Sequence, residues 1–394
     1  MPGTFTQPTS VYVLAANTAA LDFAFDDEIA IIPSEIYLES QNGVGVYSNN
    51  KLNQTLINSG TILANSSIGV ELDGPTASVT NMISGLIFGN SSGILLLGSS
   101  SQIVNNFGHI IGAVDAGVHF SGGPFLINNH GSIYSFSFGI AAQELGNGVI
   151  NNFGIIKADD VGSVAIRVQP LLASTMVEIS NSANGVISGA FYAVQHVFGE
   201  MSLINRGKII GEIRDFSGTN DHIVNHGLIR GETLLGGGDD VFQGAGGRCG
   251  SVFGEDGDDR LTGGKAADRL YGGDGSDSLT GGLGADQFFF DTALNGSVDK
   301  ITDFTPAQHD KIVLWQAVFS GVGPVGGTLA ANEFHKGIHA TTTSQHILYT
   351  PRNGFLYYDQ DGSGTTYAPI HFATLFSTPT THPSITHSSF LLEA

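Results

Sequence analysis

Five aspartates between residues 240 and 286 recur at a nearly fixed interval. From Asp259 onward the interval is nine residues, and every one of the five has a large apolar residue two positions later. Pairs of glycines, such as Gly272-Gly273, open the intervening turns. Regular carboxylates between glycine turns are suited to holding cations. The aspartates are Asp240, Asp259, Asp268, Asp277 and Asp286, and the apolar residues are Phe242, Leu261, Leu270, Leu279 and Phe288.

A nine-residue unit has room for one tight turn and one very short strand, so two units complete a coil. Asp259 then stacks on Asp277, and Asp268 stacks on Asp286 on the opposite side. The core is a thin stack of single side chains, too small to offset the ordering entropy of so many glycines. Calcium offsets both the ordering entropy and the repulsion between carboxylates, because it binds about six to eight oxygen ligands. We therefore expect a segment whose folding energy comes from calcium.

The predicted calcium ligands are these aspartates and the turn glycines, whose carbonyl oxygens lie beside them. Residues 244–253 depart from the repeat, because the unit is ten residues long and Cys249 stands where an aspartate is expected. Asp359 and Asp361 are a further candidate calcium pair, with a plain acidic turn as the alternative. The main set is Asp240, Gly257, Asp259, Gly264, Asp268, Gly273, Gly275, Asp277, Gly282, Gly284, Asp286, Asp299 and Asp303.

A second repeat, Asn-x-Gly-x-Ile, fills roughly residues 43–232. Asn106, Asn129 and Asn152 follow one another at steps of 23 residues. Short alternating strands with Asn and Gly corners, and no helical segment between them, predict a parallel β-solenoid of about eight coils. Stacked asparagines can form ladders between coils. The side chains expected inside are Ile62, Ile110, Ile133, Ile156, Ile209 and Ile229, and those expected outside include Thr61, His109, Ser132 and Lys208.

The composition narrows the possible partners. Glycine accounts for 55 of the 394 residues, lysine and arginine together for 15, and the formal net charge is −21. Such an acidic chain is poorly suited to nucleic acid and well suited to cations. Cys249 is the only cysteine, which excludes an internal disulfide. The sequence has no apolar run of membrane-spanning length, and residues 1–10 lack the pattern of a secretory signal peptide.

Residues 235–394 resemble the RTX calcium-binding proteins that are exported by type I secretion. Besides the nonapeptide repeats, Asp299–Phe304 and Asp310–Leu314 are similar to the segment that closes the β-roll in serralysin-type C-terminal domains. Leu356–Gly364 is similar to another recurring element of that family, and Ser389–Ala394 is similar to the tails of uncleaved type I secretion signals. The resemblance implies calcium ions and a type I exporter as partners, and a secreted, extracellular protein.

The sequence patterns that resemble catalytic motifs do not predict an active site. Gly89–Gly93 matches the Gly-x-Ser-x-Gly pattern, but that motif requires a strand-to-helix turn, and here a solenoid corner is expected. Glu71, His119 and Arg167 take the same place in their coils, yet two coils separate each from the next. We therefore predict no catalytic or cofactor-binding residue and favour a binding, adhesion or matrix role toward an extracellular polysaccharide or a cell-surface ligand. The alternative is a polysaccharide enzyme of the uronate lyase or C-5 epimerase type.

The expected organisation is all-β: a parallel β-solenoid, a calcium-binding parallel β-roll and a C-terminal β closure. We expect an N-terminal cap at 1–42, the solenoid at 43–233, the roll at 234–290, and the closure with its secretion signal at 291–394.

Overall fold

The computed structural model describes residues 11–14, 20–143, 146–170, 172–244 and 246–394. Its secondary structure is 51% strand and 2% helix, which confirms the all-β class. The parallel solenoid has about 13 turns in total. The chain divides into unit 1, Met1–Ser217 with Gly227–Gly231, and unit 2, Gly218–His226 with Glu232–Ala394. Residues 1–10, which carry the prediction about the signal peptide, lie outside the described residues.

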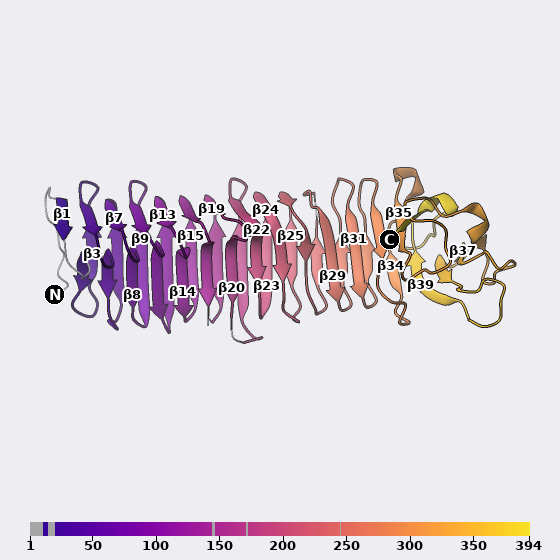
Figure 1. The fold of residues 1–394 in the computed structure, drawn as a ribbon, viewed down its shortest axis with the longest axis horizontal. Helices are drawn as coiled ribbons and strands as arrows, with labels where there is room; N and C mark the ends of the chain where they lie inside the picture. The colour runs from indigo at the N-terminus through magenta and orange to yellow at the C-terminus, as the bar shows by residue number, and fades with distance from the viewer. Residues whose placement is uncertain (1–10, 15–19, 144–145, 171, 245) are drawn as a thin grey trace. The chain divides into compact units, whose positions relative to one another are not determined.

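Unit 1 is built from three columns of parallel strands, and most coils contribute one strand to each column (Figure 1). The first column is β1 (Val11–Leu14), β4 (Tyr37–Ser40), β7 (Thr61–Ala64), β10 (Leu86–Gly89), β13 (His109–Gly112), β16 (Ser132–Ser135), β19 (Ile155–Ala158), β22 (Val186–His196), β24 (Lys208–Asp215) and β26 (Leu228–Arg230). The second is β2 (Leu21–Phe23), β5 (Val46–Ser48), β8 (Val70–Asp73), β11 (Ile94–Gly98), β14 (Ala116–Gly122), β17 (Phe138–Gln143) and β20 (Val164–Gln169), and the long strands β22 and β24 continue it. The third is β3 (Ile29–Ile32), β6 (Gln54–Asn58), β9 (Thr76–Asn81), β12 (Ser101–Asn106), β15 (Phe125–Asn129), β18 (Gly148–Asn152), β21 (Met176–Asn181) and β23 (Glu200–Asn205).

The solenoid begins before the predicted boundary at residue 43. Strand β1 pairs in parallel with β4, β2 with β5, and β3 with β6, so the described part of residues 11–42 forms coils and not a separate cap. The motif hides this because Ile32 occupies the place that Asn58 takes in the next coil. An apolar residue at that corner extends the core but gives no asparagine signal.

The interior of unit 1 follows the predicted alternation. The isoleucines of the repeat are at most 2% exposed, whereas Thr61, His109, Ser132 and Lys208 face outward. The repeat asparagines are also buried, and each Nδ2 from Asn58 to Asn181 donates to the Oδ1 of the asparagine in the next coil at 2.8–2.9 Å, while Asn205 Nδ2 donates to Leu228 O at 3.2 Å. This ladder satisfies the corner amides inside the protein, where an unpaired amide would be costly. It runs through Asn58, Asn81, Asn106, Asn129, Asn152, Asn181 and Asn205.

Unit 2 is built from two columns of short parallel strands and ends in a closure that includes antiparallel pairs (Figure 1). One parallel column is β27 (Thr233–Leu234), β29 (Ser251–Asp256), β31 (Arg269–Asp274), β33 (Gln287–Phe290), β35 (Lys311–Trp315) and β40 (Phe390–Glu393). The other is β25 (His222–Asn225), β28 (Val241–Gln243), β30 (Arg260–Thr262), β32 (Ser278–Thr280), β34 (Asp299–Ile301) and β39 (Ile370–Leu375). The closure adds β36 (Phe334–Lys336), β37 (Ile347–Thr350) and β38 (Phe355–Tyr358), with 3-10 helices η1 (Pro306–Gln308), η2 (Ala331–Glu333) and η3 (His387–Ser389).

The core of the roll is one side chain wide, as expected. Phe242, Leu261, Leu270, Leu279 and Phe288 have no exposed surface. Outside this core, Phe253, Tyr271 and Phe289 stack on one another at centroid distances of 4.2 and 4.0 Å. Within the described part of the chain, no helix is long and apolar enough to cross a membrane.

Candidate metal centre

Four aspartates form a column along one side of the roll. The backbone N–H of Asp240 donates to Asp259 Oδ1 at 2.8 Å, that of Asp259 to Asp277 Oδ1 at 2.8 Å, and that of Asp277 to Asp299 Oδ1 at 3.0 Å. All four residues are buried. The interval of 19 residues between Asp240 and Asp259 therefore does not interrupt the column, contrary to the expected break in the repeat.

A second column lies on the opposite side. The backbone N–H of Asp268 donates to Asp286 Oδ1 at 2.9 Å, and that of Asp286 donates to Asp310 Oδ1 at 3.1 Å. Cys249 takes the place of the missing aspartate, and its Sγ donates to Asp268 Oδ1 at 3.2 Å. The predicted pairs, Asp259 with Asp277 and Asp268 with Asp286, are thus both in contact.

The first glycine of each repeat makes room for the carboxylate five positions later. A Cβ on Gly254 would lie 2.0 Å from Asp259 Oδ2, and a Cβ on Gly272 would lie 2.2 Å from Asp277 Oδ2. On Gly281, a Cβ would lie 2.4 Å from Asp286 Oδ2. These distances are well inside van der Waals contact, so any side chain at these positions would displace the carboxylate.

The predicted turn glycines mostly have the backbone that only glycine adopts easily. Gly257, Gly273, Gly275, Gly282 and Gly284 all have positive φ, between 93° and 147°. Gly264 is the exception among the predicted glycines. Its N–H donates to Asp268 Oδ2 at 2.5 Å, in the turn where Lys265-Ala266 replaces the usual residues.

The free oxygens of the carboxylates point into sites that lack protein donors. Oδ2 of Asp259, Asp277 and Asp286 is buried and accepts no hydrogen bond. Burial raises the pKa of Asp259 to about 7 and that of Asp286 to about 6, and the neighbouring carboxylates add to both shifts. Buried, unsatisfied, mutually repelling carboxylates are unfavourable unless a cation or a proton joins them. An oxygen-only donor set of this kind fits calcium.

Asp299 and Asp303, the last two aspartates of the predicted set, differ from each other in their contacts. Asp299 continues the first column, and burial together with Asp277 raises its pKa to about 8. Asp303 accepts backbone hydrogen bonds on both oxygens, from Gly281 at 2.9 Å and from Gly282 at 2.8 Å. In this arrangement Asp303 holds the last repeat turn, and a direct role in binding calcium stays a prediction.

Sequence reasoning missed two features of the centre. Asp310 ends the second column, but it follows Asp286 by 24 residues, so the nine-residue interval does not reveal it. The signal that remains is Asp-Lys-Ile, which occurs at both Asp299 and Asp310. The second feature is an exposed outer ladder, in which the N–H of Asp258 donates to Asp239 Oδ1 at 3.0 Å and that of Ser276 donates to Asp258 Oδ1 at 2.7 Å.

The candidate residues of the solenoid are dispersed. Register pairs Leu95 between Glu71 and His119, and Ala141 between His119 and Arg167. With strands about 4.8 Å apart, neighbouring members of this set are about 10 Å apart. Their side chains therefore do not meet in one site, in agreement with the expectation from the repeat.

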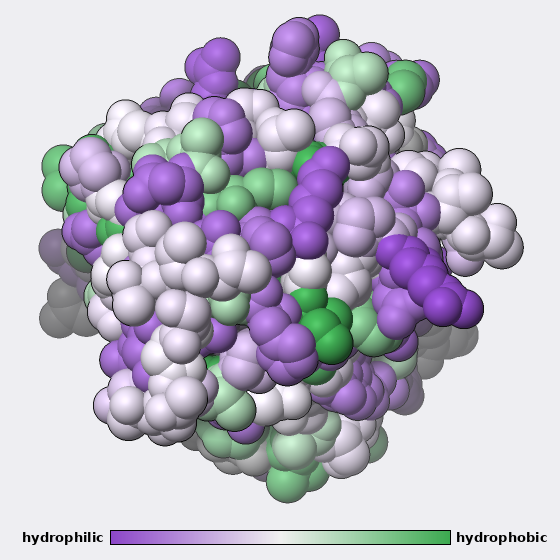
Figure 2. Space-filling view, turned by 90° about the vertical axis from the view of Figure 1, so that its right-hand side faces the viewer, coloured by the Kyte–Doolittle hydropathy of each residue, from purple (hydrophilic) through white to green (hydrophobic). Residues whose placement is uncertain are grey.

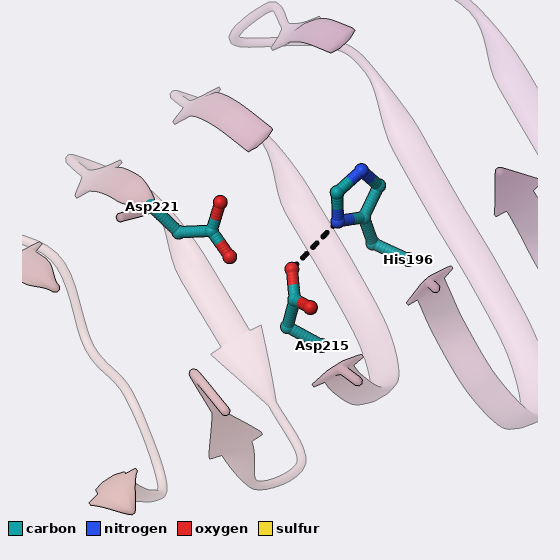
Figure 3. A group of neighbouring side chains, drawn as sticks. All are labelled: His196, Asp215 and Asp221. Carbon is teal, nitrogen blue, oxygen red and sulfur yellow. Dashed lines mark hydrogen bonds and ion pairs between the residues drawn. The ribbon is translucent and has the colours of Figure 1, made fainter. Parts of the chain in front are cut away.

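Unit 1 also buries a histidine–carboxylate pair that the sequence did not reveal. His196 Nδ1 lies 2.6 Å from Asp215 Oδ2, and neither side chain has exposed surface (Figure 3). In the register of the strands, His196 lies beside Val168 of the preceding coil and Asp215 lies beside His196, so the pair occupies an inward-facing position. Asp221, which the figure also draws, belongs to unit 2, where its N–H donates to Asp240 Oδ1 at 2.6 Å.

Short parallel strands, glycine turns and two columns of buried carboxylates define a calcium-binding β-roll of the RTX type. Residues 253–288 match the family model of the RTX calcium-binding nonapeptide repeat in four copies. The matched segment includes Asp259, Asp268, Asp277 and Asp286. Searches of curated proteins and of solved structures give no match to the chain.

Proposed function

We propose that this protein is secreted and that calcium folds residues 234–290 after export. The observation that carries the calcium part of the proposal is the set of three buried Oδ2 atoms, on Asp259, Asp277 and Asp286, which have no protein donor. Calcium bound among them would be held by these carboxylates together with Asp240, Asp268 and Asp299, and by carbonyl oxygens of the turn glycines. The ion supplies positive charge among carboxylates that repel one another, so binding and folding are coupled.

The low calcium of the cytosol would leave the roll unfolded and therefore suitable for export. Extracellular calcium modules bind at about 10⁻⁴–10⁻³ M, so millimolar calcium outside the cell stabilises the folded roll by mass action. The C-terminal tail supports this order of events. Phe390 and Leu392 in β40 are buried against β35 in the folded unit. An exporter that reads this tail must therefore reach it before the unit folds.

For the solenoid, we propose a binding, adhesion or matrix role toward an extracellular polysaccharide or a cell-surface ligand. Its strands present regular outward rows, one of which is a second asparagine ladder. Asn128 Nδ2 donates to Asn105 Oδ1 at 2.8 Å, and Asn151 Nδ2 donates to Asn128 Oδ1 at 2.9 Å. Repeated amides on a rigid face favour weak contacts at many points. The separation of Glu71, His119 and Arg167 gives no support to the lyase or epimerase alternative.

Two experiments test these proposals. Removing about the last 50 residues should retain the chain inside cells that carry a matching type I exporter, while the full chain with Asp22→Asn, a surface charge change in unit 1, is secreted normally. Undiminished secretion of the truncated chain would contradict the export proposal. Incubating the full chain with alginate and pectate in calcium should give sedimentation with the polymer and no new unsaturated ends. Release of such ends would establish the enzyme alternative instead.

A further inference from the structure

The loop that follows β38 in unit 2 holds a buried carboxylate outside the repeats. Asp359 is 3% exposed, and its Oδ1 is buried with no hydrogen-bond partner. Its backbone is fixed on both sides, because the N–H donates to His346 O at 2.8 Å and the carbonyl oxygen lies 2.9 Å from His346 Nδ1. The backbone therefore holds Asp359 in place, while no group donates a hydrogen bond to its Oδ1.

A second carboxylate of the same loop faces it. Asp361 Oδ2 accepts the backbone N–H of Thr366 at 2.8 Å, which orients the group, while Oδ1 is buried and has no partner. Burial and the charge of Asp361 both raise the pKa of Asp359. No lysine or arginine in the described part of the chain forms an ion pair with either residue. Among the described residues, the two carboxylates thus lie close together without a lysine or arginine partner.

One glycine of this loop approaches a carboxylate as closely as the glycines of the roll do. A Cβ on Gly364 would lie 2.2 Å from Asp361 Oδ2, the same distance that separates a Cβ on Gly272 from Asp277 Oδ2. Gly362 has φ +58°, and a Cβ there would lie 2.7 Å from the carbonyl oxygen of Thr342 and 2.8 Å from that of Thr343. The loop therefore packs against two backbone carbonyls of another segment, of which that of Thr342 already accepts the backbone N–H of Ser363 at 3.0 Å. Both carbonyls are neutral oxygen ligands for a cation.

We propose that Asp359 and Asp361 bind a calcium ion of their own, in a site separate from the two columns of the roll, and that this ion ties the 359–364 loop to residues 342–343. The donors are all oxygens, since the one nearby imidazole nitrogen, His346 Nδ1, is already engaged by the Asp359 carbonyl. Such a set selects calcium over zinc, and calcium accepts irregular sets of oxygen ligands better than magnesium, which requires a strict octahedron. The inference goes beyond the calcium-dependent roll and does not require it.

The test is hydrogen exchange and native mass spectrometry on the full chain. At about 10 mM calcium, an ion bound at about 10⁻⁴–10⁻³ M slows exchange of the loop by about 10- to 100-fold. We expect Asp361→Asn to remove this protection from residues 340–366 and to lower the ion count by one, with protection of residues 253–288 unchanged. Asp359→Asn should do the same. Asp277→Asn should instead weaken protection of residues 253–288 and leave residues 340–366 protected, so failure of this site can be told from failure of the roll. Asp22→Asn should change the protection of neither segment.

A purely structural role for Asp361 gives a different result. Without calcium, the wild-type and Asp361→Asn loops should exchange alike, because no ion is present in either. Faster exchange of the variant in chelator, or an unchanged ion count in both variants, would overturn the proposal. Equal protection of the loop by magnesium at the same concentration would overturn the assignment to calcium.

Discussion

The backbone N–H of Asp259 donates to Asp277 Oδ1, 18 residues later, at 2.8 Å. Each carboxylate of the roll therefore uses one oxygen to hold the backbone of the preceding coil, which leaves the second oxygen for a ligand. Asp277 does so while its own Oδ2 is buried and has no partner. The same side chains thus connect the coils and face the metal, so calcium affinity and stability of the roll should change together.

Replacing Asp277 by Asn should weaken calcium-induced folding. The amide keeps an oxygen for the Asp259 N–H but removes one negative charge from the site, and calcium affinity depends on ligand charge. We expect the calcium midpoint to rise by about tenfold, an effect of about 1.4 kcal/mol. Emission of Trp315, the single tryptophan, reports this transition from β35. Asp22→Asn is the control, and an unchanged midpoint in Asp277→Asn would remove Asp277 from the site.

The roll should respond to pH in opposite ways with and without calcium. Burial raises the pKa of Asp259 to about 7, of Asp277 to about 6 and of Asp299 to about 8 in the folded chain, against about 3.9 when unfolded. A raised folded pKa contributes stability that is complete below the unfolded value and is lost as pH rises through the folded value. The calcium-free roll should therefore be more structured at pH 5 than at pH 8.

In calcium, the same protons compete with the metal, so the calcium midpoint should increase as the pH falls from about 8 to about 5. Circular dichroism over this range, at fixed ionic strength, measures both trends. A calcium midpoint independent of pH would mean that these carboxylates do not bind the ion.

Gly272→Ala should disrupt the roll although alanine is a modest change. Its Cβ would lie 2.2 Å from Asp277 Oδ2, and such overpacking typically costs about 1–3 kcal/mol. Gly218→Ala is the matched control in unit 2, because a Cβ there has no atom within 4 Å. We expect a higher calcium midpoint for the first variant only. Equal calcium midpoints for Gly272→Ala and Gly218→Ala would show that the Asp277 carboxylate does not need the space beside Gly272.

The asparagine ladder should stabilise the solenoid without calcium. Asn129→Ala breaks the links to Asn106 and Asn152 and leaves buried amide groups unpaired, at a cost of about 2–4 kcal/mol. Asn128→Ala removes two links of the half-buried outer ladder, to Asn105 and Asn151, where water can replace the lost partners, and should cost less than about 1 kcal/mol. The melting temperatures of the two variants in chelator measure this difference in stability. Equal melting temperatures would indicate that the buried ladder adds no stability.

A repeat predicts a structure well where its interval is constant. The nine-residue spacing placed Asp259 beside Asp277, and the alternation after each Asn-x-Gly placed Ile110 and Ile133 in the core. Insertions hide the same relationships, which is why Asp310, 24 residues beyond Asp286, was not recognised. The distance along the chain changes there, but the hydrogen bond between coils does not.

Other features leave no periodic signal at all. His196 and Asp215 are neighbours in successive coils, but neither residue belongs to a recurring motif, so the sequence gives no sign that they pair. A buried pair of this kind follows only from the register of β22 and β24. On the one face that Figure 2 shows, hydrophilic and intermediate residues predominate, and hydrophobic residues form small separate patches.

Calcium-dependent folding of the roll is tested most directly by hydrogen exchange of the full chain, in chelator and in millimolar calcium. Peptides from residues 235–314 should exchange rapidly in chelator and become protected in calcium. Peptides from the described strands of unit 1 should be protected in both conditions, because their core is apolar and their corner amides pair with one another. Strong protection of residues 235–314 in chelator would contradict the account, as would a solenoid that needs calcium to fold.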